Sequence, residues 1–199
     1  MKRKKKIDAR KENTYHQLKE SLFLLLEEKT LEEIKVIDIC EKAGIHRSTF
    51  YYHFNDKLEL LKECLKETVD ELYKDVELKN QDNLYDYYDI LIDTYLDHVE
   101  KHEQFYSKIL NLKNKSISSF ILYEIISEEI YDNLEEIELE GVKFTIPIKI
   151  ISDFFSGGIL KVTDGYLNNK EEYDRNKFSE DLKLLLYHPY IVDGGTEIF

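Results

Sequence analysis

The chain has 199 residues, 42% of them hydrophobic, and a net charge of −13. With only 7 glycines and 2 prolines it is unlike collagen, low-complexity chains and Gly-rich β architectures. No apolar run nears the roughly 18 residues of a membrane span, and no apolar core follows the basic N-terminus as in a signal peptide. Because Cys40 and Cys64 have neither zinc nor redox spacing, we expect a reduced cytoplasmic protein.

The chain begins with a basic arm. Its first 11 residues hold 7 basic side chains and a single acidic one. Residues 1–67 carry 15 Lys/Arg and 13 Asp/Glu, whereas residues 68–199 carry 13 and 28. Such asymmetry indicates an N-terminal part that meets a polyanion and a C-terminal part that does not.

Helical spacing of apolar residues predicts four helices before residue 80. They cover residues 15–26, Val36–Ala43, Arg47–Phe54 and 57–76. Gly44 follows the second helix and suits the left-handed position at a helix end. Asp56 should cap the fourth helix, with Glu59 three residues later at capping-box spacing.

The polar run Lys79–Asn83 is the one convincing boundary, and the pattern beyond it is again helical. The expected helices are 84–99, Glu103–Leu112, Ser116–Ile137, Pro147–Leu167 and Arg175–Tyr187. A turn around Gly141 precedes Pro147, which fits the first turn of its helix. This helix is apolar nearly all round, so we expect it to be buried on two sides.

The stretch Val36–Lys57 carries the functional signal. Two short helices meet at Gly44, and the small Ala43 lets them approach closely, which is helix-turn-helix geometry. The side chains that can then meet phosphates or base edges are His46, Arg47, Ser48, Thr49, Tyr51, Tyr52 and His53. An ordinary αα-corner in a helical protein is the alternative interpretation.

The letters GIHRSTFYYHFNDKLELL at positions 44–61 resemble the DNA-binding signature of the TetR family of bacterial transcriptional regulators. The resemblance covers about 14–61 well and the remainder by architecture. It implies an all-α protein with a three-helix DNA-binding domain (1–57), a linking helix (58–79) and a helical domain for dimerisation and effector binding (80–199). The apolar helix with Gly157 and Gly158 resembles a subgroup from low-GC Gram-positive bacteria.

The resemblance also assigns roles to single residues. Thr49 and Tyr51 match positions that commonly contact DNA, and Tyr52 and His53 match positions near phosphates. Lys57 matches a lysine at the start of helix four whose backbone and side chain meet a phosphate. The sequence departs from the family pattern where His46 and Lys35 replace the usual Ser or Thr caps. Both are retained as candidate DNA contacts, whereas the basic arm is either a minor-groove contact or a solvated tail.

The candidate dimer interface lies near the C-terminus. Glycines inside a helix cost about 1 kcal/mol each relative to alanine, a cost that close packing against a second subunit would justify. The expected interface residues are Phe154, Gly157, Gly158, Lys161, Leu182, Leu185 and Leu186. A kink beside a pocket is the competing explanation for the two glycines.

Other signals are weaker. Tyr88, Tyr95 and Tyr123 are candidates for lining a ligand pocket, although most tyrosines here suit an ordinary core. His98 and His102 are four residues apart, but no third ligand accompanies them, so a solvated helix face is favoured over a metal site. We therefore expect no metal or cofactor, and no catalytic motif stands out.

Together these patterns predict a homodimeric repressor that binds a pseudo-palindromic DNA operator and is released by an unknown small-molecule or protein effector. A TetR-fold coactivator acting through a protein partner is one alternative. A small helical enzyme with a pocket in its C-terminal domain is another.

Overall fold

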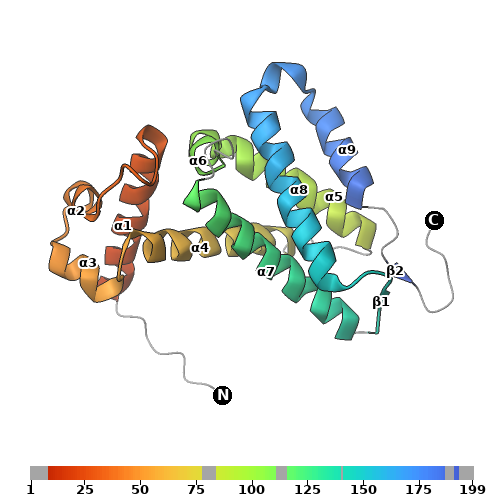
Figure 1. Ribbon diagram of the computed structural model, residues 1–199, viewed down its shortest axis with the longest axis horizontal. Coiled ribbons are helices and arrows are strands. Elements are labelled where there is room, and N and C mark those ends of the chain that lie inside the picture. Colours follow the sequence, from red (N-terminus) through yellow and green to blue (C-terminus); the bar gives the residue numbers. More distant parts are fainter. Residues whose placement is uncertain (1–8, 78–83, 111–115, 140, 187–190, 193–199) are drawn as a thin grey trace. The chain divides into compact units, whose positions relative to one another are not determined.

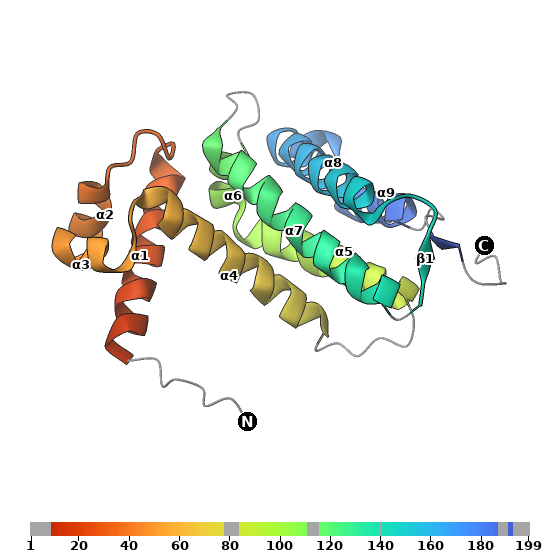
Figure 2. The same cartoon turned by 60° about the horizontal axis from the view of Figure 1, so that its bottom comes forward.

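The computed structural model describes residues 9–77, 84–110, 116–139, 141–186 and 191–192. The chain forms two compact units, residues 1–65 and 66–199, which divide inside one long helix. As predicted, the described residues are mainly helical (Figures 1 and 2). The expected boundary at Lys79–Asn83, the basic arm Lys2–Lys6 and the side chain of Tyr88 lie outside the described part.

The first unit contains three helices and the start of a fourth. These are α1 (Ala9–Glu28), α2 (Val36–Ala43), α3 (Arg47–His53) and α4 (Lys57–Glu77). Leu18 and Leu22 of α1, Ile39 of α2, Phe50 of α3 and Leu61 of α4 are all fully buried. The core therefore draws one apolar face from every helix, as the spacing predicts.

The second unit holds the remaining elements. They are α5 (Leu84–Lys101), α6 (Glu103–Ile109), α7 (Ile117–Leu139), β1 (Lys143–Phe144), α8 (Ile148–Asn168), a 3-10 turn (Lys170–Glu172), α9 (Arg175–Leu186) and β2 (Ile191–Val192). In Figures 1 and 2, α7 and α8 lie side by side, and α9 packs on α5. Phe105, Ile109, Leu122 and Leu160 contribute to the buried core.

The sequence did not predict every element. The antiparallel pair β1–β2, with Lys143 opposite Val192 and Phe144 opposite Ile191, was missed because two-residue strands give no periodicity. Pro147 was expected within the first turn of its helix, but it is the N-cap of α8, which begins at Ile148. Within one subunit α8 is buried along one side, and its other side exposes Ile150, Phe154 and Gly158.

Candidate nucleic-acid interface

The turn between α2 and α3 rests on Gly44. Its φ of 67° and ψ of 29° place it in the left-handed region, where a side chain is strained. The N–H of Ile45 donates to the carbonyl of Cys40 at 2.9 Å, and that of Gly44 donates to Glu41 at 3.3 Å. These two bonds satisfy carbonyls at the end of α2 and confirm the predicted helix end.

The helix starts lack the usual caps, as the sequence indicates. Among the described residues, neither Lys35 nor His46 makes a side-chain cap bond to its own helix. Asp38 supplies the reciprocal bond instead, because its Oδ2 accepts the Lys35 N–H at 2.8 Å. In α3, the carbonyl of His46 accepts the N–H of Thr49 at 2.9 Å, so the helix begins at Arg47.

The short helix α3 separates an inner side from an outer side. Phe50 is 0% exposed and packs on Phe54 with 5.9 Å between ring centroids. Tyr51 is 54% exposed and Tyr52 is 70% exposed. Large aromatic side chains held in water next to a packed core are available for contact with another molecule.

The predicted DNA contacts differ in their exposure. Those that are exposed are Lys35, His46, Arg47, Ser48, Tyr51 and Tyr52, and those that are half-buried are Thr49, His53 and Lys57. Most of them belong to α3 or, like His46, to its N-cap. Lys35 is the N-cap of α2, and Lys57 is the first residue of α4. Their roles toward DNA remain predictions.

Sequence reasoning missed a contact of Tyr52. The Lys11 ammonium of α1 lies 5.4 Å from the centre of the Tyr52 ring, and the His53 ring meets the same tyrosine edge-on with 5.2 Å between centroids. A cation over an aromatic face is attracted by the electrons of the ring. Lys11 and Tyr52 are 41 residues apart, so spacing along the chain could not reveal the pair.

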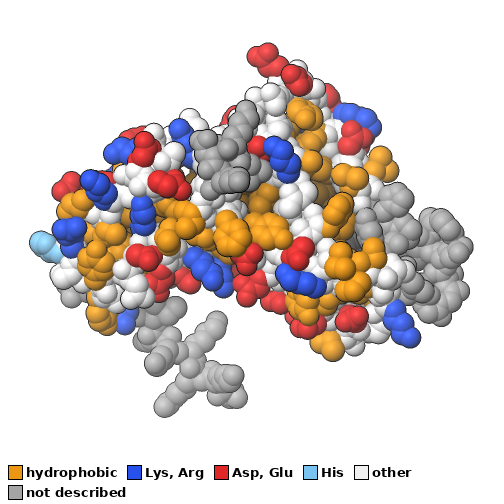
Figure 3. Space-filling view, viewed as in Figure 1, with side chains coloured by type: hydrophobic (Ala, Val, Ile, Leu, Met, Phe, Trp, Pro, Cys, Tyr) orange, Lys and Arg blue, Asp and Glu red, His pale blue; other side chains and the backbone are white. Residues whose placement is uncertain are grey.

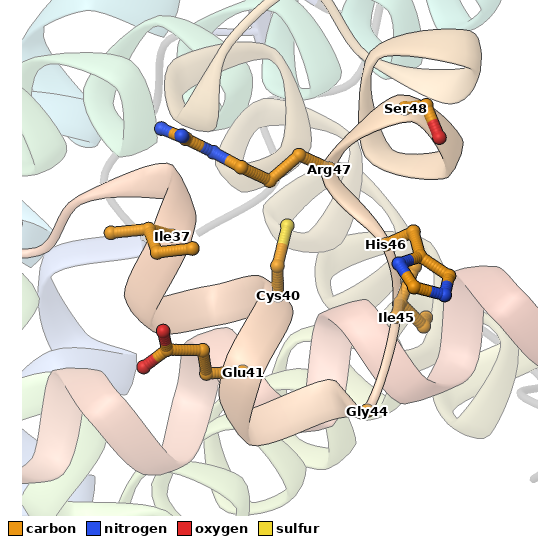
Figure 4. Close-up of a pocket in the computed structure, with 8 residues that line it drawn as sticks. All are labelled: Ile37, Cys40, Glu41, Gly44, Ile45, His46, Arg47 and Ser48. Atoms are coloured by element: carbon orange, nitrogen blue, oxygen red, sulfur yellow. The ribbon is translucent and has the colours of Figure 1, made fainter.

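A hollow of about 560 Å³ opens between α2 and α3, lined by Ile37, Cys40, Glu41, Gly44, Ile45, His46, Arg47 and Ser48. In Figure 4 the Arg47 side chain reaches back over the Cys40 thiol toward Ile37, while His46 and Ser48 lie on the other side. Burial raises the pKa of the Cys40 thiol, although the charge of Arg47 acts to lower it. The thiol therefore stays protonated at neutral pH.

The start of α4 is fixed by its own caps. Asp56 Oδ1 accepts the N–H groups of Leu58 and Glu59 at 2.8 and 2.9 Å, which confirms Asp56 as the cap. Glu59 Oε2 reaches back to the N–H of Asn55 at 2.6 Å, one residue earlier than in a standard capping box. The Lys57 ammonium points inward and donates to three backbone carbonyls of residues 31–34.

The predicted dimer residues separate into two groups. Phe154, Gly158 and Lys161 of α8 are exposed, Phe154 to 67%, and Leu185 of α9 is 57% exposed. Leu182, in contrast, is 6% exposed and packs within its own subunit, and Gly157 and Leu186 are half-buried. Figure 3 shows hydrophobic side chains along the surface over α8 and α9.

The candidate pocket residues have partners within the second unit. The Tyr95 hydroxyl donates to Thr163 Oγ1 at 2.5 Å, and Thr163 in turn donates to the Ile159 carbonyl at 2.7 Å. Burial raises the pKa of Tyr95 to about 12. Tyr123 stacks on Phe120 with 6.5 Å between centroids. Their lining of a ligand pocket remains a prediction.

The described residues contain neither a metal-binding cluster nor a membrane-spanning helix. No group of three or more His, Cys, Asp and Glu side chains in this part of the chain is placed to hold a metal ion. None of the helices described combines the length and the apolar character required to cross a bilayer.

Solved structures resemble most of the chain in fold. A protein from Listeria innocua is 21% identical, with a TM-score of 0.68 over 92% of this chain and 93% of its own. The fatty acid degradation regulator FadR from Bacillus halodurans is 16% identical, with a TM-score of 0.64 over 86% and 93%. NalD, the secondary repressor of the MexAB-OprM multidrug efflux pump in Pseudomonas aeruginosa, is 18% identical, with a TM-score of 0.62 over 93% and 99%. At these identities the likeness shows the fold.

Family models match both parts of the chain, while no curated protein matches it. Residues 21–64, which contain the α2–α3 pair, match the model described as bacterial regulatory proteins of the tetR family. Residues 88–188 match the C-terminal region of transcriptional regulators of this family. The chain therefore belongs to the TetR family of bacterial transcriptional regulators, which bind DNA through their N-terminal helix-turn-helix.

Proposed function

We propose that the protein is a homodimeric repressor that recognises a pseudo-palindromic operator. The observation that carries the proposal is the outer side of α3, where Tyr51 and Tyr52 stand in water on a helix anchored by the buried Phe50. A helix of this kind enters a major groove with its polar and aromatic side chains toward the bases. Thr49 and Tyr51 are the proposed base-reading residues.

Two copies are needed because one short helix reads few base pairs. In a two-fold dimer the two recognition helices must sit about one DNA turn, ~34–36 Å, apart. The exposed apolar side of α8 and α9, with Phe154 and Leu185, supports a self-complementary interface there. An effector that favours another separation of the helices would release DNA by shifting the population of dimers.

The proposed domains follow the same division of labour. Residues 1–57 bind DNA, 58–79 link, and 80–199 dimerise and receive the effector. The charge balance supports this assignment, because most of the excess negative charge lies after residue 67. A regulator of this design acts on DNA in the cytoplasm and needs no catalytic group.

Selection of bound fragments from a genomic library, followed by footprinting, tests the proposal. We expect a protected inverted repeat whose half-sites are about one turn apart. The Tyr51→Ala variant serves as the control that folds without selecting the site. Retention of all fragments alike would contradict specific recognition. Capture of a protein in place of DNA would favour the coactivator, and turnover of a small molecule without DNA binding would favour the enzyme.

Salt dependence provides a second test. Arg47, Lys35 and the basic arm are proposed to neutralise phosphates, and each phosphate neutralised contributes about 0.9 to the slope of log affinity against log salt. We expect a steep, linear fall in duplex affinity as salt rises. A flat response would contradict the electrostatic part of the proposal.

A further inference from the structure

The side chain of Lys57, the first residue of α4, turns toward the protein. Its Nζ lies 2.5 Å from the carbonyl oxygen of Leu31, 2.5 Å from that of Ile34 and 3.3 Å from that of Glu32. A lysine ammonium has three N–H donors and no acceptor. The three carbonyls therefore occupy all the hydrogen bonds that this side chain can make.

These carbonyls belong to the connector between α1 and α2. Leu31 and Ile34 are 1% and 0% exposed, so their backbone oxygens lie where water has little access. The connector turns tightly, because the N–H of Ile34 donates to the Leu31 carbonyl at 3.2 Å. Buried carbonyls without a donor are costly, and a charged donor satisfies them strongly. Ile34 directly precedes Lys35, the N-cap of α2.

The same turn of α4 also holds the end of α3. Asn55, which follows α3, donates its backbone N–H and its side-chain amide to Glu59 at 2.6 and 2.8 Å. The first turn of α4 thus contacts the segment that enters α2, through Lys57, and the segment that leaves α3, through Glu59. Both outer ends of the helix-turn-helix are therefore bound by side chains of the first turn of α4.

We propose that Lys57 is a positioning residue: its ammonium binds the carbonyls of residues 31–34, fixes the start of α2 to the start of α4, and does not pair with a DNA phosphate. The part of this proposal that concerns phosphate rests on the proposed function, namely that α3 binds DNA. It differs from the role that the family resemblance gives the lysine side chain. A phosphate contact by the backbone N–H at this helix start is compatible with it.

The first experiment compares Lys57→Met with Lys62→Met, which removes a charge from an exposed lysine on the same helix. Amide hydrogen exchange is followed without DNA. In Lys57→Met we expect the Ile34 and Asp38 amides to exchange at least about tenfold faster, since hydrogen bonds from charged donors contribute more than the ~1.4 kcal/mol of a tenfold change. Lys62→Met should leave them unchanged. Unchanged exchange in Lys57→Met would overturn the proposal.

The second experiment measures affinity for a short mixed-sequence duplex over a range of salt, at a temperature where both variants are folded. We expect Lys57→Met to bind more weakly than Lys62→Met, with the two salt slopes equal. A slope lower by about 0.9 in Lys57→Met alone would show that the side chain meets a phosphate, and would overturn the proposal. Equal affinities would also overturn it, because the tether would then not position the helices.

If Lys57→Met does not fold, NMR of the unmodified protein tests the proposal instead. The NMR signal of the Lys57 ammonium should be visible, slowly exchanging, and coupled to backbone carbonyl carbons. Adding the duplex should leave these couplings in place. Their replacement by coupling to phosphorus would overturn the proposal. Should no duplex bind at all, the proposed function fails, while the couplings and the exchange rates still test the tether.

Discussion

Two neighbouring residues of the recognition helix face opposite environments. Phe50 fills the core of the first unit, and its ring packs against Phe54. Replacing it by alanine leaves a cavity among well-packed helices, so Phe50→Ala should lower the free energy of unfolding by about 3–5 kcal/mol. Denaturant unfolding followed by circular dichroism measures this loss. A loss under about 1 kcal/mol would mean that the core of this unit tolerates the cavity.

Tyr51 is expected to behave in the opposite way. Because more than half of its side chain is exposed, Tyr51→Ala should leave the melting temperature nearly unchanged. If the side chain reads a base edge, operator affinity should fall by on the order of 1–3 kcal/mol. Thr49→Ala should act similarly but more weakly, since Thr49 is half-buried. Early melting of Tyr51→Ala, like that of Phe50→Ala, would contradict the assignment of inner and outer sides.

The Lys11–Tyr52 pair links the first turns of α1 to the recognition helix. A cation over a ring at an exposed site contributes about 0.5–1 kcal/mol. We expect a double-mutant cycle of Lys11→Met and Tyr52→Leu, read out as operator affinity, to give a coupling energy in this range. Additive effects of the two substitutions would mean that each side chain meets DNA independently.

At the scale of elements, ion pairs hold α9 against α5. The pairs join Arg175 to Asp97 and Glu100, and Lys183 to Asp89 and Asp93. Asp93 accepts two hydrogen bonds from α9, one from Lys183 at 2.8 Å and one from Ser179 at 2.7 Å. Burial acts to raise the pKa of Asp93, but the Lys183 and Ser179 bonds outweigh it and hold the pKa below the usual value.

This lowered pKa predicts an acid dependence with a definite sign. An unfolded aspartate has a pKa near ~3.9, so the contribution of Asp93 to stability is complete above that pH and is lost as the pH falls through the lower folded value. Lys183→Met should raise the pKa of Asp93, because the hydrogen bond and the charge of Lys183, which lower this pKa, are then lost while burial still raises it. A carboxyl-carbon NMR titration measures the shift. Lys177→Met, which breaks pairs with Glu180 and Asp181 within α9, is the control. The same Asp93 pKa in both variants would contradict the assignment.

The elements show what the sequence could and could not predict. Val36–Ala43 is confirmed to the residue, because apolar spacing, a glycine stop and a following helix agree there. The α8 helix was likewise expected within one residue at each end. The β1–β2 pair was not expected, since it joins segments 47 residues apart that carry no alternating pattern. Local sequence patterns predict helices and turns, whereas the pairing of two short distant strands leaves no local pattern to recognise.

The candidate site follows the same logic. The outer and inner sides of α3 are visible in the sequence, because helical periodicity places Phe50 opposite the exposed tyrosines. The inward direction of Lys57 is not visible, since it depends on carbonyls more than 20 residues earlier in the chain. A lysine at a helix start looks equally suited to a phosphate and to a cluster of backbone oxygens. Long-range contacts decide between the two.

At the scale of the whole molecule, charge and apolar surface are distributed between different parts. The first part is nearly neutral with a basic start, and residues 68–199 carry an excess of acidic over basic residues, 28 against 13. An acidic second part repels DNA and restricts binding to the helix-turn-helix. It leaves apolar surface on α8 and α9, with Ile150, Phe154 and Leu184 each more than half exposed. A second copy of the chain would cover this surface.

The two glycines of α8 are expected to differ in their effect on that dimer. A Cβ at Gly157 would lie 3.8 Å from Cε2 of Tyr123 in the same subunit, whereas a Cβ at Gly158 would meet no described atom within 4 Å. Gly158→Ala should therefore stabilise an isolated subunit by about 1 kcal/mol through helix propensity. If a second subunit packs closely at Gly158, the same substitution should weaken the dimer. The two effects separate on measuring unfolding at several protein concentrations.

Gly158→Glu is the sharper variant. A carboxylate placed at the centre of an apolar interface, which for an obligate dimer exceeds ~2,000 Å² in total, would be buried without a partner. We expect monomers by sedimentation, with operator affinity lost because two half-sites can no longer be bound together, while the helix-turn-helix keeps its own fold. Lys161→Glu, exposed one turn further along α8, is the control at the rim and should disturb the dimer less. A Gly158→Glu protein that still sediments as a dimer would place the interface elsewhere, and the two glycines would then serve a kink beside a pocket.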